Sequence, residues 1–99
     1  MNVQINTQRF TADSKLLDLI NEKTEKFNTF HDKIVEVEIF LKLDNIVHQI
    51  KDKVVEIKVH IPKHTFFIKH ESKTFEESFD HAYKSMVHQL KQYKEKLSA

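Results

Sequence analysis

The sequence predicts an α+β domain in which two helices pack on one face of a four-stranded mixed sheet. Three observations predict it: short segments of alternating apolar and polar residues, two longer segments with an apolar residue every three or four positions, and a β-α-β-β-β-α order along the chain. A helical crossover makes the first two strands parallel, and short turns make the later pairs antiparallel. The other face of the sheet is then open to water or to a partner.

Four segments are predicted as strands because apolar and polar residues alternate along them: 2–7, 34–44, 53–61 and 65–70. Residues 44–52 break the alternation, and Pro62 begins a turn because it cannot donate a ladder hydrogen bond. The residues expected to face the core are Val3, Ile5, Val35, Val37, Ile39, Leu41, Leu43, Val55, Ile57, Val59, Ile61, Phe66 and Ile68.

The first helix is predicted at about residues 12–28, where apolar residues fall at helical spacing. Either Thr11 or Asp13 can cap its start. Asn28, followed by Thr29, is expected to close it, because asparagine tolerates the left-handed conformation of a helix C-cap. The apolar stripe of this helix consists of Leu16, Leu17, Ile20, Thr24 and Phe27.

The last quarter of the chain, residues 73–97, is predicted as one long amphipathic helix. Thr74 and Glu77 form a capping box. In this motif the threonine hydroxyl accepts a hydrogen bond from the Glu77 amide, and the Glu77 carboxylate reaches back to the backbone amide of Thr74. The stripe expected in the core consists of Phe75, Phe79, Ala82, Tyr83, Met86, Leu90, Tyr93 and Leu97. The solvent-facing side is basic and rich in imidazole, and it consists of His81, Lys84, His88, Lys91 and Glu95.

A chain of 99 residues is expected to form a single domain, 1–99, with one hydrophobic core. No apolar run approaches the ~20 residues of a membrane span, and no export signal precedes Val3, so a cytoplasmic protein is expected. The chain contains no cysteine, which excludes disulfides, thiolate catalysis and cysteine-ligated zinc.

The absence of glycine excludes several classes of enzyme. Phosphate-binding loops, dinucleotide fingerprints and nucleophile elbows need glycine, because their backbone takes a positive φ or approaches a ligand closely. Ser78, Asp80 and His81 are close in sequence, but on a helix they point in different directions and form no catalytic triad. We therefore expect no enzyme and no cofactor.

Seven histidines raise the question of a metal site. His81 and His88 are about 10.5 Å apart along a helix, which is too far for one ion. His60 and His64 flank the proline turn, but no carboxylate or third histidine stands at ligand spacing in the sequence to complete a set. We expect no metal, and we interpret the histidines as surface groups that add positive charge in mildly acidic solution.

The final helix resembles that of a known family. The segment Thr-Phe-Glu-Glu-Ser-Phe-Asp from Thr74, followed by Gln89-Leu90 and by Lys-Glu-Lys-Leu from Lys94, is similar to the ribosome hibernation factors, which include hibernation-promoting factor and protein Y. The resemblance covers essentially the whole chain. It implies a fold like that of double-stranded-RNA-binding domains, and a non-enzymatic stress-response protein that binds the small ribosomal subunit and inhibits translation in non-growing cells.

The resemblance also implies where ribosomal RNA binds. Lys94 and Lys96 match basic positions of the family's last helix, whereas Ser85, His88 and Gln92 stand where members usually have lysine or arginine. Lysines on a rigid helix can each meet a phosphate and release counterions. The expected rRNA-binding residues are Lys84, His88, Lys91, Lys94 and Lys96. The chain resembles the short class of the family, which lacks the C-terminal domain of long members. This implies a protein that is a monomer when free and occupies single ribosomes. Neither DNA nor a membrane is expected as a partner.

A protein-interaction module is the alternative function. Its partner, for example a second copy of the chain, would pair with the open sheet face through Phe40 and Phe67, which are also the candidates for base stacking. Glu36 and Glu38 are predicted on the same face and would repel phosphate. RNA is therefore expected at the last helix rather than across the sheet.

Overall fold

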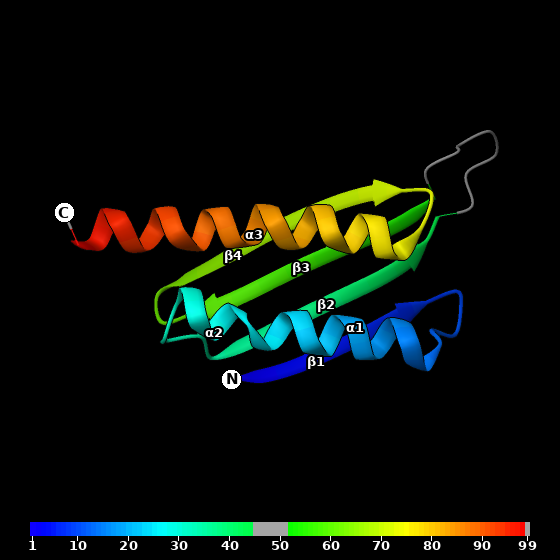
Figure 1. Ribbon diagram of the computed structural model, residues 1–99, viewed down its shortest axis with the longest axis horizontal. Helices are drawn as coiled ribbons and strands as arrows, with labels where there is room; N and C mark the ends of the chain where they lie inside the picture. Colours follow the sequence, from blue (N-terminus) through cyan, green and yellow to red (C-terminus); the bar gives the residue numbers. More distant parts are fainter. Residues whose placement is uncertain (45–51, 99) are drawn as a thin grey trace.

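The computed structural model describes residues 1–44 and 52–98, with the side chains of 94–98 outside the described part. Seven elements follow one another along the chain (Figure 1): β1 (Asn2–Gln8), α1 (Ser14–Glu25), α2 (Phe27–Phe30), β2 (Glu36–Leu43), β3 (Lys53–Ile61), β4 (His64–Ser72) and α3 (Phe75–Ser98). The α+β class and the β-α-β-β-β-α order are confirmed. The likeness to double-stranded-RNA-binding domains stays a prediction.

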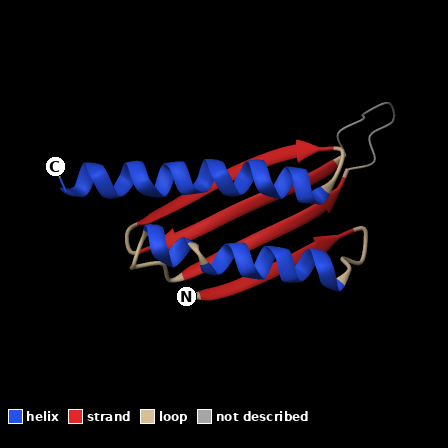
Figure 2. Ribbon diagram, viewed as in Figure 1, coloured by secondary structure: helices blue, strands red, loops and turns tan. Residues whose placement is uncertain are grey.

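The four strands form one mixed sheet in the order β1-β2-β3-β4. β1 runs parallel to β2, and the β2–β3 and β3–β4 pairs are antiparallel, as the crossover and turn rules predict. The helices lie on one face of this sheet (Figure 2), so no helix of the described part covers the other face. In the part of the chain that the structure describes, no helix is long and apolar enough to span a bilayer.

The core lies between the sheet and the helices. Ile5, Ile39, Ile57 and Ile68 stand side by side across the four strands, and Ile39 and Ile57 are fully buried. Burying each such side chain contributes about 1.5–3 kcal/mol. The helices cover this row with buried Leu16, Ile20, Phe27, Phe75, Phe79, Ala82, Met86 and Leu90.

The first helical segment differs from its prediction. Asp13 caps α1, and its carboxylate accepts from the Leu16 amide at 2.8 Å. The prediction of one continuous helix at about 12–28 is wrong, because α1 ends at Glu25 and a separate helical turn, α2, follows Lys26. The Lys26 amide donates back three residues to the Lys23 carbonyl at 3.1 Å, and this tighter step separates the two helices.

Asn28 does not close the helix as expected, because it lies inside α2. Among the described residues, a positive φ occurs only at Arg9 (70°) and Lys63 (68°), which lie in the connection after β1 and in the turn after Pro62. Phe27 directly follows the helix break at Lys26, and its side chain is fully buried in the core. Packing of this one ring therefore outweighs the local signal for a helix end.

The second predicted strand begins two residues later than expected. Val35 was assigned to the core, and this is wrong, since its side chain is 60% exposed and precedes β2. Ile34 is buried instead, so the chain arriving from α2 enters the sheet out of phase with the alternation of β2. Leu43, at the other end of β2, is only half-buried, and the pattern break predicted beyond it falls largely on residues outside the described part.

β4 is longer at both ends than the predicted 65–70. Phe66 is buried and Ile68 is half-buried on the core side, as expected. Phe67 lies on the open face with 48% of its surface exposed, which confirms that assignment.

The start of α3 contains half of the predicted capping box. The Glu77 amide donates to Thr74 Oγ1 at 3.1 Å. The Glu77 carboxylate does not reach back in the described contacts, and instead lies 3.8 Å from His81 Nε2. A fully buried hydroxyl, that of Ser78, donates to the Lys53 carbonyl at 2.5 Å and fixes the first turn of α3 to the start of β3.

Candidate nucleic-acid interface

The outer face of α3 consists of the exposed side chains His81, Lys84, His88 and Lys91. Residues on the opposite side of the same helix, such as Ala82, Met86 and Leu90, are fully buried, so the amphipathic pattern fixes which face reaches solvent. The structure therefore brings three of the predicted rRNA-binding residues together on one face. Lys94 and Lys96 continue α3, but their side chains are outside the described part.

Charge is graded along this face. Acidic residues occupy its first turns, where Glu77 lies near His81 and Asp80 Oδ2 is 2.9 Å from Lys84 Nζ. The Lys84–Asp80 pair is 72% and 53% exposed, so it contributes at most about 1 kcal/mol and a phosphate can replace the carboxylate. In the sequence, the later turns carry Lys84, Lys91, Lys94 and Lys96 against Glu95 alone, so positive charge increases toward the C-terminal half of α3.

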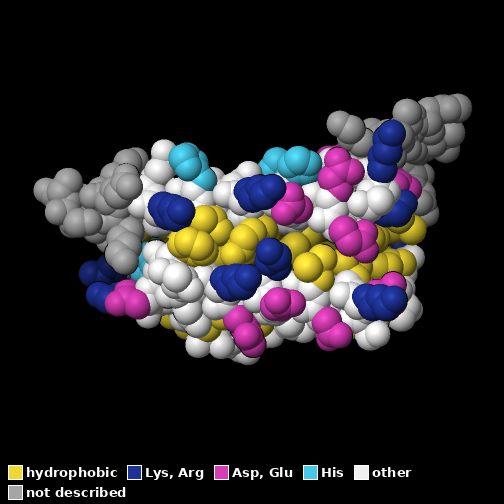
Figure 3. Space-filling view, viewed as in Figure 1, with side chains coloured by type: hydrophobic (Ala, Val, Ile, Leu, Met, Phe, Trp, Pro, Cys, Tyr) yellow, Lys and Arg dark blue, Asp and Glu magenta, His cyan; other side chains and the backbone are white. Residues whose placement is uncertain are grey.

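The helices α1 and α2 pack beside α3, and two lysines reach across this helix boundary in opposite directions. Lys91 of α3 lies over the ring of Phe30 in α2, with Nζ 5.1 Å from the ring centroid. Lys23 of α1 lies over the ring of Tyr83 in α3, at 5.9 Å. Hydrophobic side chains form a strip between the two helices, with lysines on either side (Figure 3). We call this surface, with the outer face of α3, the helix face.

Lys23 was not among the predicted site residues. The sequence places it only on the first helix, and no local signal relates it to a residue sixty positions later. Its position over Tyr83 follows from the packing of α1 beside α3. The half-buried Tyr83 ring stacks on Phe27 with centroids 5.1 Å apart, and burial raises the pKa of its phenol.

A second residue missed by the sequence analysis is His70 of β4. Its Nε2 lies 3.2 Å from the hydroxyl of Ser85, one of the positions where the resemblance implied a lysine or arginine. The His70 ring is also 5.8 Å from that of His81. An imidazole from the neighbouring strand therefore stands beside the position that lacks a cation.

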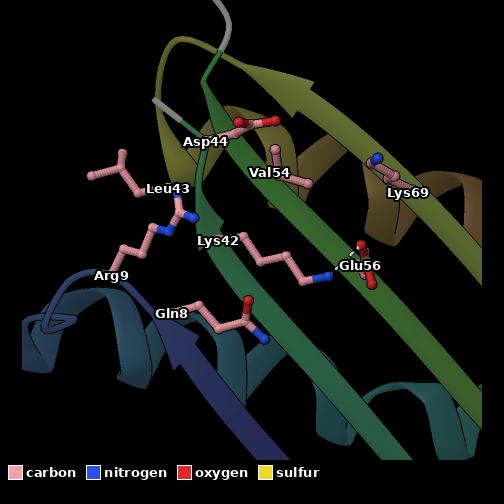
Figure 4. Close-up of a pocket in the computed structure, with 8 residues that line it drawn as sticks. All are labelled: Gln8, Arg9, Lys42, Leu43, Asp44, Val54, Glu56 and Lys69. Carbon is pink, nitrogen blue, oxygen red and sulfur yellow. Dashed lines mark hydrogen bonds and ion pairs between the residues drawn. The ribbon is translucent and has the colours of Figure 1, made fainter. Parts of the chain in front are cut away.

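The open sheet face has mixed charge. A hollow of about 270 Å³ lies at one end of it, where Lys42 Nζ is 2.9 Å from Glu56 Oε2. Figure 4 shows the residues that line it, including Arg9 and Lys69 from neighbouring segments. Farther along the face, Lys58 Nζ lies 5.4 Å from the ring centroid of Phe40 and 5.8 Å from that of Phe67. Glu36, Glu38 and Glu71 share this face, so it is less suited to a polyanion than the helix face.

The fold and the helix face define a small α+β protein that presents lysines and imidazoles along an exposed helix. The chain belongs to the sigma 54 modulation protein / S30EA ribosomal protein family, whose pattern matches residues 3–98. The resemblance to the ribosome hibernation factors is thereby confirmed. The family is that of a ribosome-associated factor, as the sequence analysis expected.

Two solved structures share this fold. A ribosomal subunit interface protein from Coxiella burnetii has a TM-score of 0.81 and 23% identity, covering 95% of this chain and 98% of its own. The Thermus thermophilus Protein Y N-terminal domain has a TM-score of 0.80 and 18% identity, covering 94% and 99%. At these identities the likeness establishes the fold alone. No curated protein sequence matches the chain significantly.

Proposed function

We propose that this protein binds the small ribosomal subunit through its 16S rRNA, using the helix face, and inhibits translation in non-growing cells. The observation that carries the proposal is the pair of lysines, Lys23 and Lys91, which reach across the boundary between α3 and its neighbouring helices, next to the exposed Lys84 and His88 of α3. The names of the structural neighbours, a ribosomal subunit interface protein and Protein Y, support the same partner.

The physical basis is electrostatic. Each lysine placed against a phosphate releases condensed counterions, and such contacts supply much of the affinity for RNA. The backbones that carry Lys23 and Lys91 are helical and packed against the core, so ordering them on binding costs little entropy. Side chains cannot enter the deep, narrow major groove of an RNA helix. Contacts to the phosphates and to the shape of the helix, as proposed here, therefore suit folded ribosomal RNA.

The proposal describes a cytoplasmic binding protein without catalytic activity. It acts by occupying the subunit, so inhibition requires binding alone and no cofactor. We further propose that the free protein is a monomer. Light scattering on RNA-free protein measures this directly.

The test compares two double variants that remove the same charge from opposite faces. Lys84→Gln with Lys91→Gln alters the helix face, and Arg9→Gln with Lys69→Gln alters the rim of the open-face hollow. Sedimentation with purified small subunits across a salt series gives the affinity and its salt dependence. We expect the slope of log affinity against log salt to fall by about 1.4–1.8 units in the helix-face variant and to stay unchanged in the other.

Two results would contradict this proposal. Equal losses in both variants would show that net charge alone matters, and a loss confined to the second would move the RNA to the sheet. Cell-free translation with each variant then asks whether inhibition follows subunit binding.

The alternative, a module that pairs with a protein through the open face, is favoured by one observation. Phe67 exposes 48% of its surface beside Lys58 and Phe40. A dimer of the RNA-free protein in light scattering that Phe67→Ser converts to a monomer would favour this function.

A further inference from the structure

Three metal-ligating side chains converge on the open sheet face, away from the helix face. Glu36 and Glu38 of β2 and His60 of β3 each offer one ligand atom, and these atoms lie within 4.8 Å of one another. Glu36 and His60 are direct cross-strand partners although 24 positions separate them in the sequence. Sequence spacing gives no sign of this set, because the sheet register alone brings it together.

His60 is held in position from both sides. Its Nε2 is 3.0 Å from Glu38 Oε1, and its Nδ1 is 3.1 Å from the hydroxyl of Thr65 on β4. A partner on the second nitrogen is the usual arrangement for a metal-binding histidine, because it fixes the ring and directs the other nitrogen at the ion. All three ligating residues are half-buried on adjacent inner strands, so their backbone is rigid.

The charges around the set favour a cation. Two carboxylates share one imidazole, and the lysine directly opposite Glu38, Lys58, directs its ammonium over the rings of Phe40 and Phe67 instead. In the described part of the chain, Glu36 has no lysine or arginine within 4.0 Å. The neighbours on β1 that pair with Glu36 and Glu38 are the uncharged Asn2 and Gln4.

We propose that Glu36, Glu38 and His60 form a binding site for a divalent transition-metal ion, with Zn²⁺ as the best-fitting ion. Zinc accepts a mixed set of imidazole nitrogen and carboxylate oxygen at about 2.0–2.2 Å, and three protein ligands leave a fourth position for water on this exposed face. Mg²⁺ prefers six oxygens and Ca²⁺ six to eight, which this set does not supply. The bound ion would join β2 to β3 and cancel the negative charge at this end of the face.

The test is a titration of the purified full chain with ZnCl₂ by calorimetry, followed by Co²⁺ absorption as a report on coordination geometry. We expect one ion per chain, and we expect Glu38→Gln or His60→Gln to weaken binding at least tenfold. Thr65→Val removes only the partner of Nδ1 and should weaken it by about tenfold, as outer-shell changes do. Glutamine keeps the size of each side chain, and a thermal melt of each variant confirms folding.

The other histidines require a matched control. His64→Gln removes a nearby exposed imidazole, and Glu71→Gln removes a carboxylate from the same sheet face, so both variants should bind Zn²⁺ like the parent. Absence of binding by the parent, or binding that Glu38→Gln and His60→Gln leave unchanged, would overturn the site. Ribosome binding is measured separately, so either proposal can fail alone.

Discussion

The ammonium of Lys91 in α3 lies 5.1 Å from the centre of the Phe30 ring in α2. A cation over a ring at an exposed site gains about 0.5–1 kcal/mol, so this contact helps to hold α2 against α3. A double-mutant cycle of Lys91→Gln and Phe30→Leu, measured by urea unfolding, should therefore show a coupling energy of about 0.5–1 kcal/mol. If the two single substitutions lower the free energy of unfolding additively, the lysine and the ring do not stabilise each other.

Lys23 should contribute to ribosome binding although it lies outside the final helix. Its ammonium stands 5.9 Å from the centroid of the Tyr83 ring, at the boundary between α1 and α3. If it meets a phosphate, Lys23→Gln should lower the salt slope of small-subunit binding by about 0.7–0.9 units. Lys15→Gln, an exposed change on the same helix, is the control and should leave the slope unchanged. A lower slope for Lys15→Gln with an unchanged slope for Lys23→Gln would place the RNA at the start of α1.

The strands and the long helix could be predicted because their signals are local. Alternation in β3 and the apolar stripe from Phe75 to Leu90 are properties of consecutive residues, and the structure reproduces both. The sequence could not predict the helix break at Lys26 or the exposure of Val35. Both depend on how Phe27 and Ile34 pack into a core that distant segments build.

The solvent-exposed face of the last helix could be predicted, and its role in binding rRNA stays a prediction. An amphipathic helix fixes its own solvent side, so Lys84, His88 and Lys91 could be placed from the sequence. Lys23 and His70 join them only through tertiary packing and strand pairing. The same limit applies to Glu36 and His60, whose proximity is a consequence of antiparallel register.

Ser78 should be one of the most sensitive polar residues for stability. Its hydroxyl is fully buried and donates to the Lys53 carbonyl, so Ser78→Ala leaves that carbonyl without this donor. We expect a loss of about 1–3 kcal/mol in the free energy of unfolding, reduced slightly by the better helix propensity of alanine. Ser85→Ala, a half-buried hydroxyl near His70, is the control and should cost less. Equal stability of the Ser78 variant and the parent would be incompatible with this bond.

Removal of the Thr24 hydroxyl should instead stabilise the protein. Its hydroxyl oxygen is buried in α1 and has no hydrogen-bond partner in the described part of the chain. Thr24→Val keeps the shape and removes the polar atom, so the free energy of unfolding should rise by about 1 kcal/mol. Thr29→Val, at an exposed position of α2, should change it by no more than about 0.5 kcal/mol. A destabilised Thr24 variant would indicate that the hydroxyl has a partner in solution.

Tyr83 should make the protein less stable in alkaline solution. Its ring packs on Phe27 and Phe79, and burial raises the pKa of the phenol above its ordinary value of 10.0. The unfolded chain therefore loses the Tyr83 proton at a lower pH than the folded protein does. The stability linked to this proton is fully present below about pH 10 and is lost as the pH rises through the raised pKa.

Tyr83→Phe keeps the ring and removes the proton, so its unfolding free energy should fall less steeply than that of the parent above about pH 10. Lysines also titrate in this range, but both proteins share them, and the difference between the two curves isolates Tyr83. The chain has two tyrosines, so Tyr93→Phe leaves Tyr83 as the only phenol, and ultraviolet absorbance then follows its ionisation directly. A midpoint at the ordinary value in that variant would show that the ring is more accessible to water than its packing on Phe27 and Phe79 implies.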